Sequence, residues 1–445
     1  MITPIRRECL WRQPAVVATA MARHWGEAGM VWLDGDGSNL GRWVTLAADP
    51  INHFCCRGLP DEPEADNPFA ALRELNSGHW CGWLSYEAGA WLEPRNPWKS
   101  DGMATLWMVR HDPVLRFDLR EQQLWIEAED PSRLETMAAW LAALPADQSS
   151  NPSSNTQPAA EPWRSLAINN WQWQTSRADF ARGVTHIRER IADGDLFQAN
   201  LTVCCCASAE EHSALELFQR LRQRCPAPFA GLLVGTGAAS AEAVISASPE
   251  RFLQVQPWGA VESRPIKGTR PRNPNPNTDA DIAAELVCSS KDRAENVMIV
   301  DLLRNDLGRV CKPGSIRVPQ LVGLESYSQV HHLTSVVQGE LQQGKTWVDL
   351  LQACWPGGSI SGAPKLRACQ RLHELEPVPR GPYCGSLLRL DWDGRFDSNI
   401  LIRSLLLQAG KLRAHAGCGI VIDSDPKAEA EELNWKLMPL LEALE

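Results

Sequence analysis

Several carboxylates fall on helical faces that would otherwise be apolar. Glu295 precedes Met298, Ile299 and Leu302 by three, four and seven residues, which places all four on one face of a helix. A carboxylate on such a face must be paired, bind a metal or reach the rim of a cleft. From the spacing alone, a rim carboxylate in contact with solvent is the simplest interpretation, because ionised carboxylates are seldom fully buried.

The end of the chain repeats this pattern. Glu429, Glu432 and Lys436 share one helical face, beside Leu433 and Leu440. A solvated helix with an internal Glu–Lys pair is again the simplest interpretation. Two separate helices with carboxylates would also suit Mg²⁺, a hard cation held by one or two carboxylates together with substrate oxygens and water. Such oxygen donors argue against tight binding of metals that prefer thiolates.

Three glycine-rich segments could bring backbone amides close to an anion: residues 265–269 (PIKGT), 357–364 (GGSISGAP) and 416–420 (AGCGI). None of them matches the P-loop or the dinucleotide-binding pattern, and a tight turn would explain each. Lys267 lies inside the first segment. A lysine removed from water can lose its proton and become a nucleophile, although most loop lysines are merely solvated.

The elements that must position these residues indicate an α+β protein, with runs of antiparallel strands among helices. A capping-box pattern at Ser176 predicts a helix that ends at residues 193–195 and is followed by a strand. The other expected elements are a helix over roughly 292–304, a hairpin of 400–407 and 411–415 that turns at Ala409-Gly410, and a last helix that starts at Asp425-Pro426.

Composition excludes several classes of protein. Of the 445 residues, 54 are acidic and 44 are basic, and this net charge of −10 argues against nucleic-acid binding. No apolar run reaches the roughly eighteen residues of a membrane span, and the N-terminus lacks the apolar core of a signal peptide, so we expect no membrane contact and a cytoplasmic protein. The 14 cysteines show no zinc-site spacing and are expected to be buried thiols in a reducing compartment.

One segment rich in Ser, Asn and Pro divides the chain. Residues 144–165 have little to bury and are predicted to form a flexible linker or a surface excursion. They separate a strand-rich first part, 1–143, from a longer second part, 166–445. A surface excursion within a single domain would produce the same pattern.

Several long motifs, in order, resemble the chorismate-utilising family, which includes anthranilate synthase, aminodeoxychorismate synthase, isochorismate synthase and salicylate synthase. The matching runs are SPERF (248–252), PIKGTR (265–270), KDRAENVMIVDLLRNDLGRV (291–310), VHHLTS (330–335), PGGSISGAPKLRA (356–368), ILIRSLL (400–406) and AGCGIVIDSDP (416–426). WLDG, GRWVTLAADP and GWLSYEAG give the first part a weaker match. The resemblance implies an anthranilate synthase component I-like fold, with two packed antiparallel sheets surrounded by helices, in which 1–143 is the N-terminal part and 166–445 the chorismate-binding catalytic region.

Residues at two positions distinguish the reactions catalysed by different members of this family. Members that add water carry a lysine base where this chain has Gln198, and because an amide cannot take that proton, isochorismate and salicylate formation are not expected. Anthranilate synthases typically read PIAGT where this chain reads PIKGT. The lysine form resembles aminodeoxychorismate synthase component I, which aminates chorismate at C4 on the route to p-aminobenzoate and folate.

The resemblance also implies roles for individual residues. Lys267 would attack C2 of chorismate, and Glu250 would protonate the departing C4 hydroxyl. Mg²⁺ would be held on a substrate carboxylate by Glu295 and Glu432, with Glu429 close by. The substrate-binding groups would be Tyr383, Arg403, Lys436 and the amides around Gly417 and Gly419, with His332, Gly358 and Ser359 lining the ring pocket.

Ammonia is expected from a separate glutamine amidotransferase, because the chain shows no nucleophile-elbow cysteine with His and Glu partners. Tryptophan is a further candidate ligand, in the first part. Two alternatives stay open: the large subunit of anthranilate synthase, which aminates C2 and eliminates pyruvate, and a non-catalytic regulatory or partner-binding subunit. The intact set of Glu250, Lys267, Glu295 and Glu432 argues against the second alternative.

Overall fold

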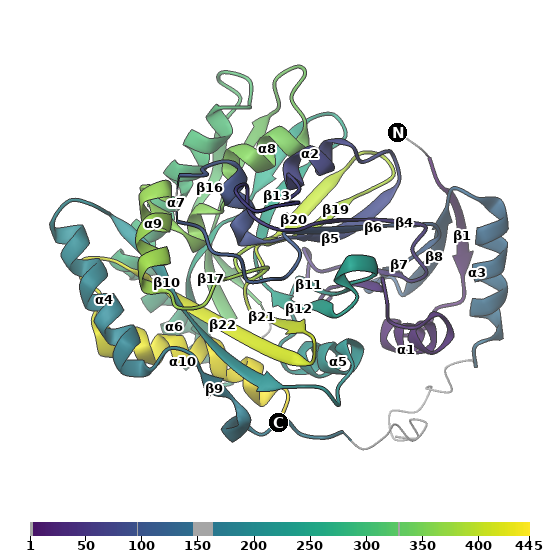
Figure 1. The fold of residues 1–445 in the computed structure, drawn as a ribbon, viewed down its shortest axis with the longest axis horizontal. Coiled ribbons are helices and arrows are strands. Elements are labelled where there is room, and N and C mark those ends of the chain that lie inside the picture. Colours follow the sequence, from purple (N-terminus) through teal and green to yellow (C-terminus); the bar gives the residue numbers. More distant parts are fainter. Residues whose placement is uncertain (1–2, 96, 146–162, 328–329) are drawn as a thin grey trace.

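The computed structural model describes residues 3–95, 97–145, 163–327 and 330–445. Within them, two large antiparallel sheets pack face to face, with helices around them (Figure 1). The expected α+β fold is confirmed. In the described residues, no helix has both the length and the apolar character needed to cross a membrane.

The first sheet has the strand order β1–β8–β7–β3–β2–β11–β12–β21–β22–β10–β18, with β9 paired to β10. Its strands are β1 (Ile5–Cys9), β2 (Val31–Asp34), β3 (Trp43–Ala47), β7 (Val114–Asp118), β8 (Gln123–Ala128), β9 (Gln172–Trp173), β10 (Gln198–Ser208), β11 (Phe229–Val234), β12 (Glu242–Ser248), β18 (Gly362–Ala363), β21 (Ser404–Gln408) and β22 (Lys411–Ile420).

The second sheet has the order β15–β17–β14–β13–β20–β19–β5–β6–β4, with β16 paired to β17. Its strands are β4 (Asn52–Cys56), β5 (His79–Leu84), β6 (Leu106–His111), β13 (Arg251–Val255), β14 (Ala260–Ser263), β15 (Ile266–Pro271), β16 (Arg317–Ser326), β17 (Val330–Glu340), β19 (Ser386–Leu390) and β20 (Phe396–Asn399).

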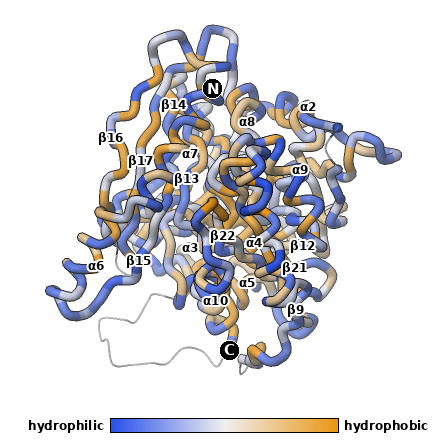
Figure 2. Tube along the Cα trace, turned by 90° about the vertical axis from the view of Figure 1, so that its left-hand side faces the viewer, coloured by the Kyte–Doolittle hydropathy of each residue, from blue (hydrophilic) through white to orange (hydrophobic). Residues whose placement is uncertain are grey.

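Helices cover the outer faces of both sheets. They are α1 (Pro14–Trp25), α2 (Pro68–Arg73), α3 (Pro131–Ala143), α4 (Arg177–Ala192), α5 (Ala214–Arg224), α6 (Pro276–Cys288), α7 (Ser290–Gly308), α8 (Trp347–Cys354), α9 (Lys365–Leu375) and α10 (Pro426–Glu442), and short 3₁₀ turns include η4 (Gly358–Ile360). Figure 2 shows hydrophobic residues along the inner strands and hydrophilic ones in the peripheral loops, as burial of an apolar core requires.

The two parts of the sequence share both sheets. Strand β2 pairs with β11 in the first sheet, and β5 pairs with β19 in the second. Strands from before and after the predicted linker are therefore hydrogen-bonded neighbours. Of that linker, residues 146–162 lie outside the described residues.

Most of the predicted local elements are confirmed. Ser176 caps α4, and its Oγ accepts a hydrogen bond from the Asp179 amide. Strands β21 and β22 form the expected hairpin, and Asp425 caps α10. The strand predicted from residue 400 begins only at Ser404, because Arg403 has a φ of 53°, a left-handed conformation that interrupts an extended strand.

Two helices from different sheets bring the acidic residues together. Helix α10 packs on β22 of the first sheet (Figure 1), and α7 packs on β15 and β17 of the second. Lys291 near the start of α7 forms an ion pair with Glu429 in the first turn of α10, with 2.9 Å between Nζ and Oε1. The ion pair therefore joins the first turns of the two helices, one from each sheet.

The cysteines follow the expectation from their spacing. All 14 are free thiols, most of them buried. No disulfide contributes to holding the two sheets together.

Candidate active site

Lys267 reaches from β15 into the space between α7 and η4. Its Nζ donates a hydrogen bond to the Ser359 carbonyl oxygen at 3.1 Å and lies 3.9 Å from Oε2 of Glu295. The Lys267 side chain is only 13% exposed. Ser359 and Glu295, which come from two distant motifs, therefore lie next to the Lys267 amine.

Glu250 lies in the turn between β12 and β13 and is buried. Burial raises the pKa of its carboxyl to about 7, although hydrogen bonds from Ser359 and the Ile266 amide and the nearby Lys267 amine oppose that rise. Near neutral pH a large fraction of Glu250 therefore carries a proton. Such a group can donate a proton to a leaving oxygen.

Glu295 of α7 is largely buried, not the solvated rim residue that its spacing alone favoured. Burial raises the pKa of its carboxyl, and the charges of Lys267 and Lys291 oppose the rise. Gln198 donates from Nε2 to Oε2 of Glu295 at 3.5 Å, and its own Oε1 is buried without a hydrogen-bond partner in the described structure.

The carboxylates of α10 each have a lysine partner. Glu432 pairs with Lys436, with 2.7 Å between Oε1 and Nζ, so the solvated Glu–Lys pair expected from the spacing is present. Burial alone would raise the pKa of Glu432, but Lys436 and Lys291 outweigh it and lower that pKa. Glu429 is buried, and its Oε1 accepts hydrogen bonds from Lys291 and from Ser424 Oγ.

Two further cationic side chains were predicted for the site, Arg403 before β21 and Lys436 of α10. Within the described residues, the guanidinium of Arg403 makes no hydrogen bond or ion pair, and burial lowers its pKa. Lys436 donates from Nζ to the Gly417 carbonyl at 3.0 Å. Tyr383 is buried and stacks on His415, with 4.9 Å between ring centroids. A guanidinium without a partner in the described residues is suited to a planar carboxylate.

His332 lies on β17 and is nearly fully buried. Its Nδ1 is 2.8 Å from the Thr269 hydroxyl. Burial and, secondarily, the charge of Arg403 lower its pKa to about 4, so the imidazole is neutral at pH 7. A neutral ring can donate or accept a hydrogen bond but adds no charge.

Glycines keep the backbone of the site open. A Cβ on Gly419 would lie 2.5 Å from Nε2 of Gln198 and 3.2 Å from Oε2 of Glu295. A side chain at this position would therefore displace the Gln198 amide from its place beside Glu295. Gly417 stands two residues earlier on β22, and Gly358 begins η4, directly before Ser359.

The structure thus gathers the predicted residues at one place, from β15, β17, η4, α7, β22 and α10. Sequence reasoning did not single out Lys291, which joins the two acidic helices. Its signal was available, since Lys291 precedes Glu295 by four residues and so shares its helical face.

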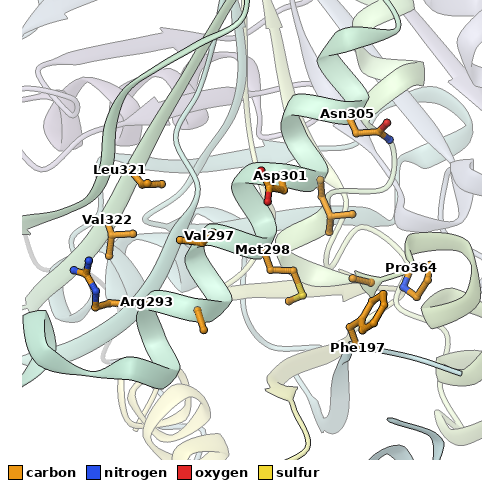
Figure 3. Close-up of a pocket in the computed structure, with 12 residues that line it drawn as sticks. Phe197, Arg293, Val297, Met298, Asp301, Asn305, Leu321, Val322 and Pro364 are labelled. Carbon is orange, nitrogen blue, oxygen red and sulfur yellow. The ribbon is translucent and has the colours of Figure 1, made fainter. Parts of the chain in front are cut away.

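A separate groove of about 740 Å³ lies along α7, next to this site (Figure 3). Its lining is mostly apolar and includes none of the residues predicted for the site: Phe197, Arg293, Ala294, Val297, Met298, Asp301, Leu302, Asn305, Leu321, Val322, Ala363 and Pro364. It is therefore not the chemical centre.

Comparison with known proteins agrees with this geometry. The model of the chorismate binding enzyme family matches residues 24–442. An anthranilate synthase component I-like protein of Synechocystis sp. is 38% identical over 433 residues, which cover 92% of this chain and 84% of that protein. Aminodeoxychorismate synthase component 1 of Klebsiella aerogenes is 40% identical over 411 residues, which cover 90% and 84%.

Solved structures show the same fold. Anthranilate synthase component I from Streptococcus pneumoniae superposes with a TM-score of 0.73 at 25% identity, over 90% of this chain and 92% of that chain. The match to this enzyme family extends over nearly the whole sequence. It therefore does not support the interpretation as a non-catalytic subunit. The chain belongs to the chorismate binding enzyme family and is an enzyme that acts on chorismate.

Proposed function

We propose that this enzyme aminates chorismate at C4 to give 4-amino-4-deoxychorismate, with Mg²⁺ and with ammonia from a separate glutamine amidotransferase. The observation that carries the proposal is the position of the Lys267 amine, 3.1 Å from the Ser359 carbonyl oxygen and 3.9 Å from Glu295. An amine of the protein that occupies C2 excludes ammonia from that carbon and leaves C4 for the external nucleophile.

In the first stage, Lys267 Nζ forms a bond to C2 while the ring double bonds shift and the C4–O bond breaks. The neutral carboxyl of Glu250 gives its proton to the departing oxygen, which leaves as water. The pKa of about 7 for Glu250 supports this role, because a carboxyl with an ordinary pKa would be ionised at neutral pH.

In the second stage, ammonia forms the bond to C4, the double bonds shift back, and the bond from C2 to Lys267 breaks. The ammonium group formed at C4 then returns one proton to Glu250. The balance is chorismate plus ammonia to aminodeoxychorismate plus water. Positioning of the amine before attack replaces the entropy cost of a bimolecular encounter.

The carboxylates of α7 and α10 fit a magnesium ion. Glu295 and Glu432 would hold it with oxygen donors, and Glu429 adds a third carboxylate whose Oε2 is buried without a partner. Bound Mg²⁺ would neutralise a carboxylate of the dianionic substrate. Arg403 and Lys436 provide the positive charge for the rest of that dianion.

The name of the Klebsiella relative, component 1, supports a partner subunit. The sequence shows no glutaminase machinery of its own. The single chain is therefore expected to use ammonium salts and not glutamine.

Product identification tests the proposal. The pure chain is incubated with chorismate, Mg²⁺ and ammonium at alkaline pH, and the products are separated; glutamine in place of ammonium is the control. Aminodeoxychorismate from ammonium alone supports the proposal. Turnover of glutamine by the single chain would show that the ammonia source is wrong.

The alternative is C2 amination, as in anthranilate synthase. The names of the Synechocystis and Streptococcus relatives favour it. Anthranilate together with pyruvate in the same incubation would establish this alternative and overturn the assignment to C4.

A further inference from the structure

A thiol stands beside the carboxylates of α10. Cys418 lies on β22 between Gly417 and Gly419, and it is fully buried. Because side chains alternate along a strand, Cys418 points to the face opposite those two glycines, which is the face that α10 covers. Its Sγ donates a hydrogen bond to the Glu429 carbonyl oxygen at 3.5 Å.

The cluster of Cys418, Glu429 and Glu432 has the composition of a metal site. One ligand atom from each residue lies within 4.8 Å of the others, and this is the only such group of three among the described residues. In a tetrahedral site with zinc, neighbouring sulfur and oxygen ligands are about 3.5 Å apart. A side-chain movement of about 1 Å would close the cluster around an ion.

The lysines leave one oxygen of each carboxylate available. Oε1 of Glu429 is taken by Lys291 and Ser424, while Oε2 is buried without a hydrogen-bond partner in the described structure. Lys436 likewise takes Oε1 of Glu432. A buried carboxylate oxygen with no partner is costly, and a cation is one way to satisfy it.

We propose that Cys418, Glu429 and Glu432 form a binding site for a thiophilic divalent cation such as Zn²⁺. Sulfur is a poor ligand for Mg²⁺ and a good one for Zn²⁺ and Cd²⁺. On binding, the thiol proton leaves to water, and the ion is held by one thiolate and two carboxylate oxygens. The expectation from the sequence, that this helix offers only oxygen donors, missed Cys418 because β22 and α10 meet only in the fold.

This site shares Glu429 and Glu432 with the proposed magnesium site. A thiophilic ion on Glu432 therefore competes with Mg²⁺ and inhibits the enzyme. That consequence rests on the proposed function, whereas binding of the thiophilic ion does not.

Metal binding by the full chain without chorismate tests the site. Zn²⁺ affinity is measured by calorimetry, and Cd²⁺ is followed by its sulfur-to-metal charge-transfer absorption. All proteins carry Cys288→Ala, which removes the exposed thiol. The variants are Cys418→Ala and Cys418→Ser, and the matched control is Cys311→Ala, since Cys311 is equally buried but belongs to no such cluster.

We expect both Cys418 variants to lower Zn²⁺ affinity at least tenfold and to lose charge-transfer intensity, while the Cys311 variant keeps both. Thermal unfolding of each variant establishes that it is folded, and Cys418→Ser retains a side chain of similar size if alanine disturbs the core. Equal Zn²⁺ affinity in all four proteins, or none in the parent, would overturn the site. Neither result would alter the product formed with Mg²⁺ and ammonium, so the two proposals fail separately.

Discussion

Lys267 and Lys436 lie on opposite sides of one site and have different surroundings. Lys436 is 2.7 Å from Glu432 and donates to a carbonyl; burial lowers its pKa, but the nearby Cys418 and Glu432 outweigh burial and raise it. Lys267 has a carbonyl partner too, but its nearest carboxylate is 3.9 Å away. The lysine in close contact with a carboxylate is held as a cation, whereas the other is free to move onto a substrate.

The two lysines therefore suggest a division of roles between the two regions. We expect the α10 side to bind charge and the β15 side to carry out covalent chemistry. The α10 side carries the ion pairs Lys291–Glu429 and Lys436–Glu432, which on the proposed function hold fixed charges for an anionic substrate and Mg²⁺. The β15 side carries Lys267 and, nearby, Glu250, which on the proposed function are the nucleophile and the proton donor. Mutations on the two sides should therefore change different kinetic quantities.

The largest effect is expected from Lys267→Ala. Loss of the nucleophile should lower the rate of C4 amination by about 10³-fold or more, about 4 kcal/mol of barrier, and open C2 to ammonia so that some C2-aminated product forms. The measurement is product analysis by chromatography. Lys436→Ala is the matched comparison and should mainly raise KM. Full activity and unchanged regiochemistry in Lys267→Ala would contradict the covalent role of Lys267.

Glu250→Gln should lower kcat by about 10²-fold or more, because an amide cannot give up the proton. The proposed function makes the acid form of Glu250 the active one, so kcat of the parent enzyme should fall as pH rises through about 7, the pKa of Glu250. The variant should lack that limb of the kcat–pH profile. If kcat of the variant still fell near pH 7, the titrating group would be a residue other than Glu250.

The same carboxyl should reduce stability at alkaline pH. Its pKa is raised from the ordinary value of about 4.5 to about 7 in the fold, so stability falls as pH rises through this interval, by up to about 3 kcal/mol. Glu250→Gln should therefore raise Tm at pH 8 more than at pH 4. Thermal unfolding of both proteins at the two pH values measures the difference, and an equal change in Tm at both would contradict the burial account.

Glu295→Gln and Glu432→Gln should act through the metal. We expect each to raise the Mg²⁺ concentration for half activity at least tenfold, about 1.4 kcal/mol of binding. Magnesium titration of initial rates measures it. Unchanged titrations in both variants would remove these carboxylates from the metal site.

The sequence predicted individual helices and strands better than the tertiary contacts between them. Helix α10, the β21–β22 hairpin and the cap of α4 follow from local signals, namely Asp-Pro, Ala-Gly and Ser with a following Asp. The burial of Glu295 could not be read from spacing, because it depends on α10, η4 and β15 closing over α7. The resemblance to a family implied a metal-binding role for Glu295 but not its burial.

Other features lie beyond local patterns. The left-handed backbone at Arg403 interrupts a run that reads as a continuous strand. Cys418 becomes a neighbour of Glu429 only when β22 packs on α10. The pairing of β2 with β11 and of β5 with β19 likewise joins segments that lie on either side of the polar linker in the sequence.

The most direct test of the central claim is a mass measurement on the peptide that contains Lys267. The enzyme is incubated with Mg²⁺ and a chorismate analogue that is reactive at C2, without ammonia, and then digested; Lys436 lies on a separate peptide and serves as the internal control. The account predicts a mass increase on the Lys267 peptide alone, absent in Lys267→Ala. Labelling of the Lys436 peptide instead, or an unlabelled Lys267 in an enzyme that still aminates C4, would contradict it.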